Sequence, residues 1–288
     1  MVKQLKKFLL KFKELSLFDL LLGLGLFLVA LSFFLFFFRK NIYLKATIKV
    51  TDDNVLYAYT NSPSWFSFLF YKGISEKDGL GKTQAEVLDV LLYPISPNTK
   101  AAYLTVKLKT VYDKRKNQYS FKGEPVLIGN PLKLNFENLA VEGLVIDVEG
   151  FPKQGKEIEV ISDAQLLYES PVFPETQGVP DYIANAFSVG DKSHDSQKNV
   201  LVEILEKRVV SADKVVTDDK GNLLVRKDPF RKDVFLKLRV RLKQINNELY
   251  FLDTLKFAIG QSIPVQLEKV TIDPVITEIY SDSTMTTN

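Results

Sequence analysis

Few residues of this chain have the types and the spacing that chemistry requires. Residues 79–83 (GLGKT) resemble the end of a phosphate-binding loop. That loop needs a glycine five residues before its Gly-Lys pair, and Glu76 stands there instead. A helix must also follow, because its N-terminus holds the phosphates, whereas residues 85–92 have the pattern of a strand. We therefore interpret 79–83 as a polar turn between strands and predict no nucleotide site.

The chain contains one histidine, His194, which stands between Ser193 and Asp195. A catalytic triad needs side chains that are neighbours in space, and consecutive residues of a strand or turn point apart. His194 could also contact a metal together with Asp191 and Asp195. An exposed loop histidine is the more ordinary interpretation of this pattern, and it is the one we adopt.

Two acidic pairs, at 52–53 and at 218–219, lack the ligand spacing of a calcium-binding loop. The chain has no cysteine, which excludes disulfides, thiol nucleophiles and thiolate metal sites. We therefore predict no catalytic residue, no cofactor and no metal, and we do not expect an enzyme.

Four aromatic residues cluster about 25 residues beyond the apolar segment described next, and they are the candidate contact residues of the chain: Trp65, Phe66, Phe68 and Phe70. One interpretation places them in the core of the first domain or as a lid over it. The other is a patch that faces lipid or a partner, because aromatic side chains are favoured at interfaces.

A membrane anchor is predicted at residues 20–38, which are nineteen consecutive uncharged residues. As a helix they extend roughly 28 Å, close to the ~30 Å hydrocarbon core of a bilayer. A buried core helix normally keeps a polar face. A cleavable signal peptide has a shorter apolar region and a site of small residues, whereas Arg39 and Lys40 follow here. We therefore expect a retained transmembrane helix.

The charge is divided unevenly along the chain. Residues 1–19 form a basic amphipathic segment suited to an anionic leaflet, which favours a cytoplasmic N-terminus and extracytoplasmic C-terminal domains. Residues 1–40 carry seven Lys or Arg and two acids, or +5, so the remainder carries 31 basic and 33 acidic residues, or −2. A nucleic-acid partner is therefore excluded, because the basic excess lies beside the anchor.

The rest of the chain is a duplication, in which residues 46–150 (copy one) recur as residues 156–280 (copy two). The matching blocks are 50–57 with 160–168, 70–73 and 85–88 with 187–190 and 202–205, Leu104–Lys109 with Leu238–Lys243, and 128–145 with 259–276. Each block alternates apolar and polar residues, as a half-buried strand does. The sequence predicts a mainly β fold with two tandem, homologous small β-barrels or β-sandwiches, and the alternation does not separate these two architectures.

Copy two carries an additional segment, 208–232, with residues 218–222 as a predicted hairpin tip. It is either a tolerated surface insertion or a protruding contact element. Residues 281–288 are expected to be a disordered tail.

With these blocks in hand, the chain resembles a family of single-pass bacterial membrane proteins of unassigned function. The resemblance rests on the basic N-terminus, the sequence LFDLL at 17–21, the sequence FSVGD at 187–191 with the strand VEIL after it, and the Ile259-Gly260 strand. The same order is distantly similar to mammalian-cell-entry-type domains, which are small β-barrels on a transmembrane helix. Some of those form rings that pass lipids, but the long apolar pore loop of such members has no counterpart here.

Together these features predict a single-pass protein of the cell membrane with tandem extracytoplasmic β-domains. We expect it to bind a partner or to act in envelope assembly. The expected partners are the lipid bilayer and either a second copy of the chain or another envelope protein. The alternative is a lipid-transport subunit of the mammalian-cell-entry type that forms oligomeric rings.

Overall fold

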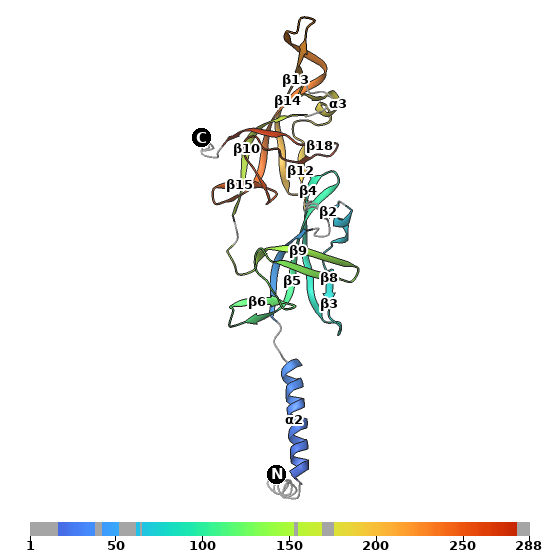
Figure 1. Cartoon of the computed structure of the whole chain (residues 1–288), viewed down its shortest axis with the longest axis vertical. Coiled ribbons are helices and arrows are strands. Elements are labelled where there is room, and N and C mark those ends of the chain that lie inside the picture. Colours follow the sequence, from blue (N-terminus) through green and yellow to red (C-terminus); the bar gives the residue numbers. More distant parts are fainter. Residues whose placement is uncertain are drawn as a thin grey trace. The chain divides into compact units, whose positions relative to one another are not determined.

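The computed structural model describes residues 17–37, 42–51, 62–63, 65–152, 155–168 and 176–280 (Figure 1). By their contacts the residues divide into two compact units, Met1–Ile42 and Tyr43–Asn288. The first unit contains helix α2 (Leu17–Phe37), whose described side chains are all exposed. Among the described residues we find no helix that is both long and apolar enough to cross a membrane. Most of the predicted basic segment 1–19 and the predicted tail 281–288 lie outside the described residues.

The second unit is mainly β, as predicted, and its first sheet belongs to copy one. The strand order is β3-β4-β5-β1-β9-β8, and the sheet curls so that its end strands β3 and β8 meet in a barrel-like form. Its elements are β1 (Ile42–Thr51), β2 (Ser62–Pro63), the short helix η1 (Phe66–Leu69), β3 (Ser75–Lys77), β4 (Thr83–Ser96), β5 (Thr99–Asp113), β6 (Gln118–Phe121), β7 (Glu124–Pro125), β8 (Pro131–Phe136) and β9 (Leu139–Val148).

The second sheet belongs to copy two and has the matching order β12-β13-β14-β10-β19. The counterpart of β8 in copy two is β17. It pairs with β18 in a separate two-stranded sheet because Pro264 and Pro274 have no N–H to donate to a longer ladder. The elements are β10 (Lys156–Leu166), β11 (Val179–Pro180), α3 (Asp181–Ala184), β12 (Lys192–His194), β13 (Val200–Thr217), β14 (Leu223–Ile245), β15 (Glu248–Phe251), β16 (Leu255–Lys256), β17 (Val265–Gln266), β18 (Thr271–Ile272) and β19 (Val275–Tyr280).

Each copy has its own hydrophobic core, formed by the alternate residues of its strands. In β8 the burial pattern alternates strictly, with Leu132, Leu134 and Phe136 buried and the residues between them exposed. The two cores are not isolated from each other, because Tyr93 and Ile95 of copy one pack against the core of copy two.

Hydrogen bonds fix which residues of the two copies correspond. Gly73 N donates to Val87 O at 2.8 Å, and Gly190 N donates to Ile204 O at 2.9 Å. The predicted match of these two blocks is therefore confirmed. The block around Gly129 is confirmed in the same way, because the N–H groups of Gly129 and Gly260 donate to matching carbonyls in β9 and β19.

The predicted match between β5 and β14 is wrong by two residues. Val87 pairs with Val106, and its counterpart Ile204 pairs with Leu238. Val106 therefore corresponds to Leu238, whereas the sequence alignment placed Leu104 there. Strand side chains repeat every two residues, so a slip of two leaves the apolar pattern unchanged.

The first predicted block is also wrong. Ile48 and Ala164 pair with corresponding residues of β9 and β19, so they occupy the same position in the two copies. Val50 therefore corresponds to Leu166 and not to Val160. Strand β1 also begins before residue 46, the predicted start of copy one.

The additional segment of copy two is shorter than predicted. Ser211 pairs with Lys232 as Pro94 pairs with Lys100 in copy one, so the residues around this pair belong to the duplicated hairpin. Only residues 214–230 are extra, and we call them the arm. They extend β13 and β14 as a two-stranded ribbon beyond the rest of the sheet of copy two (Figure 1).

Candidate interaction surfaces

The glycine-rich stretch 79–83 forms the turn between β3 and β4, as interpreted from the sequence. Asp78 Oδ1 accepts hydrogen bonds from the backbone N–H groups of Leu80 and Lys82, each at 2.9 Å. These hydrogen bonds hold the pKa of the Asp78 carboxyl below its usual range. Two backbone N–H groups that could have faced a phosphate thus already have a carboxylate acceptor.

The same turn recurs twice in copy two. Asp195 Oδ1 accepts from the N–H groups of Gln197 and Asn199 at 2.8 and 2.9 Å. Asp218 does the same at the tip of the arm, where its pKa is held low chiefly by hydrogen bonds from Asn222. The acidic pair at 218–219 is therefore part of a turn. The pair at 52–53 lies outside the described residues.

The residues around His194 do not form a catalytic arrangement. Ser193 is buried, His194 is exposed on the other side of β12, and Asp195 is engaged in its turn. Asp191 Oδ2 accepts a hydrogen bond from Ser188 N at 2.8 Å. Across the part of the chain that the structure describes, no group of three or more His, Asp or Glu side chains could hold a metal.

The aromatic segment divides between the core and the surface. Phe70 is buried in the first core and Phe66 packs against that core, whereas Trp65 and Phe68 are exposed. Phe66 meets Trp65 and Phe70 edge-on, with ring centroids 5.8 and 5.3 Å apart. Each of the two interpretations from the sequence therefore fits part of the segment.

A groove of about 420 Å³ lies at the seam where β3 meets β8. Its apolar lining includes Phe68, Tyr71, Ile74 and Leu139, and an ion pair between Lys77 and Glu137 lies beside it. The corresponding groove in copy two is lined by charged and polar side chains: Asp191, Lys192, His194, Gln266 and Glu268. The duplication therefore preserves a groove at this position but not its chemistry.

The two copies are joined through the β4–β5 hairpin of copy one. Leu92 N donates to Ser196 Oγ at 2.8 Å, and Ser196 N donates back to Leu92 O at 3.1 Å. Gln197 Nε2 donates to Asp89 Oδ2 at 2.8 Å. The turn that contains Asp195 is thus hydrogen-bonded to β4 through both backbone and side-chain groups.

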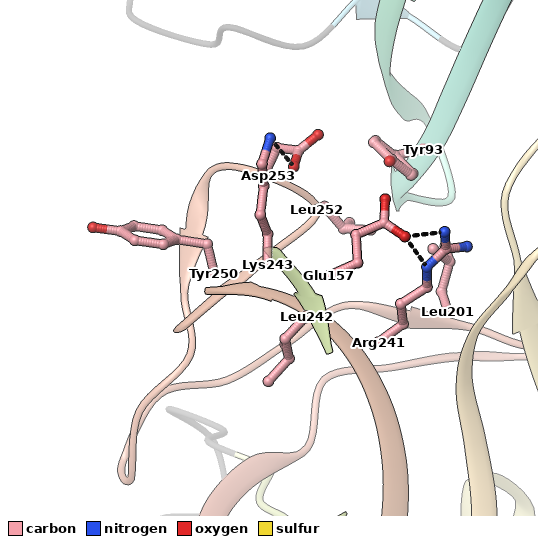
Figure 2. Close-up of a pocket in the computed structure, with 9 residues that line it drawn as sticks. All are labelled: Tyr93, Glu157, Leu201, Arg241, Leu242, Lys243, Tyr250, Leu252 and Asp253. Carbon is pink, nitrogen blue, oxygen red and sulfur yellow. Dashed lines mark hydrogen bonds and ion pairs between the residues drawn. The ribbon is translucent and has the colours of Figure 1, made fainter. Parts of the chain in front are cut away.

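Two tyrosines complete this joint. Tyr103 Oη donates to Leu252 O at 3.3 Å, and burial raises the pKa of both Tyr103 and Tyr93. Figure 2 shows Tyr93 close to Leu252 and to the ion pair between Glu157 and Arg241. Both phenols remain protonated at neutral pH, so Tyr103 keeps the proton that its hydrogen bond requires.

A cleft of about 620 Å³ lies beside the joint and is lined by both copies. Burial lowers the pKa of Lys49 in this cleft, and the opposite charge of Asp253 partly offsets that effect. Asp253 also pairs with Lys243 at 3.2 Å (Figure 2). A single carboxylate of copy two therefore balances one lysine from each copy, which makes this cleft an electrostatic contact between them.

Several large apolar side chains of the arm are exposed. Leu223 is 73% exposed, Val225 68% and Val215 43%, and Phe230 is also exposed. Val215 lies directly opposite Val225, and Thr217 opposite Leu223, so these side chains share one face of the ribbon. A group of exposed apolar side chains on one face of a projecting hairpin indicates an interaction surface.

Sequence reasoning singled out the arm and the aromatic segment but missed the joint. Tyr93 and Tyr103 continue the ordinary alternation of their strands and so give no signal of their own. The only signal lies in a correct alignment, which shows Val210 and Phe235 at their positions in copy two. A tyrosine retained in one copy alone suggests a contact made by that copy alone.

Comparisons of this chain with protein-family models, with curated proteins and with solved structures found no match.

Proposed function

We propose that this protein is a membrane-anchored extracytoplasmic protein that binds a protein partner through its arm and catalyses no reaction. The observation that carries this proposal is the exposed apolar face of residues 214–230, which has no counterpart in copy one. Exposing Leu223 and Val225 to water is unfavourable, at roughly 25 cal/mol for each Å² of apolar surface. A partner that covers this face recovers that free energy.

The duplication supports the choice of this hairpin as the contact element. In copy one the corresponding hairpin, β4–β5, makes the joint to the neighbouring domain. In copy two the positions of Leu92 and Tyr93 are taken by Val209 and Val210, both of which are exposed. The second hairpin therefore presents, and lengthens, the surface that the first one uses to bind.

The membrane anchor of this proposal is residues 20–38. Its support is the sequence alone, which has nineteen consecutive residues without a charge. A run of this length without a charge is the sequence pattern of a segment surrounded by lipid. The basic N-terminal segment favours a cytoplasmic N-terminus, which places both copies outside the cytoplasm.

The absence of catalysis is part of the proposal because the Ser and Asp side chains with catalytic potential are buried or hydrogen-bonded within turns. Asp78, Asp195 and Asp218 close turns, and Ser193 is buried away from His194. Replacing His194 with Ala should therefore leave the phenotype of the protein unchanged.

The proposal is tested by placing a photo-crosslinking amino acid at position 223 of the full chain in native membranes. The matched control is position 80, because Leu80 is 74% exposed and also lies beside a hairpin turn. We expect a protein adduct of defined mass from position 223 and none from position 80. Equal labelling at both positions, or no adduct at 223, would refute the role of the arm. An adduct with lipid alone would favour the lipid-transport alternative.

A further inference from the structure

The two faces of the arm carry different charges. One face, which we call the apolar face, has three cross-strand pairs: Asp213 with Lys227, Val215 with Val225, and Thr217 with Leu223. Its single acid and single base form an ion pair, so its net charge is zero. The opposite face carries Lys214 beside Arg226, followed by Val216 beside Leu224, and is therefore basic. Because the net charge of the apolar face is zero, a surface that packs against it needs no net charge of its own.

The apolar face is complementary to itself in one arrangement. If a two-fold axis runs along the arm between two stacked ribbons, β13 of one chain faces β14 of the other. Val215 then meets Val225 of the second chain, and Asp213 meets Lys227 of the second chain. If the arms instead point in opposite directions, Lys227 meets Leu223 of the second chain, and each charge keeps only the ion pair within its own chain. The charge pattern thus selects the arrangement in which both arms point the same way.

We infer that the partner of the arm is a second copy of this chain, and that two arms pack face to face through Val215, Leu223 and Val225. This inference rests on the proposed function, in which the arm is the contact element. The basic faces, with Lys214 and Arg226, lie on the outside of the pair, where water screens their repulsion. The resulting interface is isologous, with each chain contributing the same residues.

Other occupants fit the arm less well. An anionic bilayer would attract Lys214 and Arg226, but the tip that would enter it first carries Asp218 and Asp219. In copy two, Ser196 and Leu252 form the receiving end of the joint, because they accept hydrogen bonds from copy one. The corresponding end of copy one carries Lys109 and Lys122. Lys122 there is ion-paired with Glu76, and Asp78 closes the adjacent turn, so this end offers the arm no excess of opposite charge.

The interface is small. Three apolar side chains and one threonine from each chain bury well under the ~1,000 Å² that a stable complex normally needs. We therefore expect a weak dimer, which forms when both chains are confined to one membrane and their effective concentration is high. The experiment must accordingly be carried out in the membrane and not after dilution in detergent.

The absence of cysteine makes a direct test possible, because any introduced thiol is the only one in the chain. The full-length variants Val225→Cys and Leu224→Cys are each treated with a short bismaleimide in native membranes. Leu224 is the control because it directly precedes Val225 on the same strand and points to the opposite face. We expect a cross-linked species of twice the chain mass for Val225→Cys, at a yield several-fold above that for Leu224→Cys.

Charge exchange then tests the arrangement of the two arms. Asp213→Lys in the Val225→Cys background should reduce the yield several-fold, because lysines then face each other. The double exchange Asp213→Lys with Lys227→Asp should restore it. Equal yields from positions 225 and 224, or no loss with Asp213→Lys, would overturn the inference. If position 225 gives no dimer while position 223 still labels a different protein, the proposed function stands and only the identity of the partner is wrong.

Discussion

The hydroxyl of Ser162 allows a quantitative test of how far the two copies share one design. Ser162 is 0% exposed, and its Oγ has no hydrogen-bond partner among the described residues. By the pairing of β10 with β19, the corresponding residue of copy one is Ala46, which is 1% exposed. A hydroxyl buried without a partner costs about 1–3 kcal/mol. Because Ser162→Ala removes that cost and only one atom of packing, it should raise the free energy of unfolding by about 1–2 kcal/mol.

The assay is urea unfolding of the full chain in detergent, followed by circular dichroism. With an m value of about 3 kcal/mol/M, a gain of about 1.5 kcal/mol moves the midpoint for copy two up by about 0.5 M. The reverse change, Ala46→Ser, should lower the stability of copy one by a similar amount. The only tryptophan, Trp65, belongs to copy one, so its fluorescence reports that copy. Unchanged or lower stability in Ser162→Ala would refute the reasoning, because the hydroxyl must then have a partner.

Three further predictions concern individual turns and contacts. Gly143→Ala should destabilise copy one by about 1–3 kcal/mol, because the added Cβ would lie 2.5 Å from Lys49 O. Gly79→Ala is the control because the space around Gly79 is open, and equal unfolding midpoints of the two variants in Trp65 fluorescence would contradict the prediction. Lys198→Gly should stabilise copy two by about 0.5–1 kcal/mol in thermal unfolding, because Lys198 has a φ of +66° in a conformation that favours glycine; a lower melting temperature would argue against it. The pKa of Asp218 is lowered in the folded arm, so its stabilisation is present above about pH 4 and is lost as the pH falls through the lowered pKa. The protection factor of the Asn222 amide, which is its exchange rate relative to that of an unfolded peptide at the same pH, should therefore fall in acid, and an Asp218→Asn variant that keeps the same pH dependence would contradict this.

The sequence was sufficient to predict the class of fold and the existence of the duplication. Alternation over blocks such as 128–145 and the glycines at their edges indicated strands and turns, and the structure has both. The alignment of β5 with β14 could not be predicted, because apolar alternation is identical after a slip of two residues. Only the hydrogen bonds between strands separate these registers, and they involve partners far away in the sequence.

The surfaces could be predicted only in part. Residues 218–222 have the composition of a hairpin tip, so the presence of a projecting hairpin followed from the sequence. Which side chains share a face of the arm did not, because a bulge between Ser211 and Asp213 shifts the pairing. The joint was also hidden, since the hydrogen bond from Tyr103 to Leu252 connects residues 149 positions apart.

The two copies contribute different parts to the joint, so the joint depends on the order of the copies along the chain. Copy one supplies the hairpin, and copy two supplies the receiving end with Ser196 and Leu252. At the corresponding positions copy one has Gly79 and Lys122, and a glycine has no Oγ to accept the hydrogen bond that Ser196 accepts. Copy one thus resembles the capping repeat of a longer array, which closes one end of the series. A chain with the two copies in reverse order would keep both cores and lose the joint.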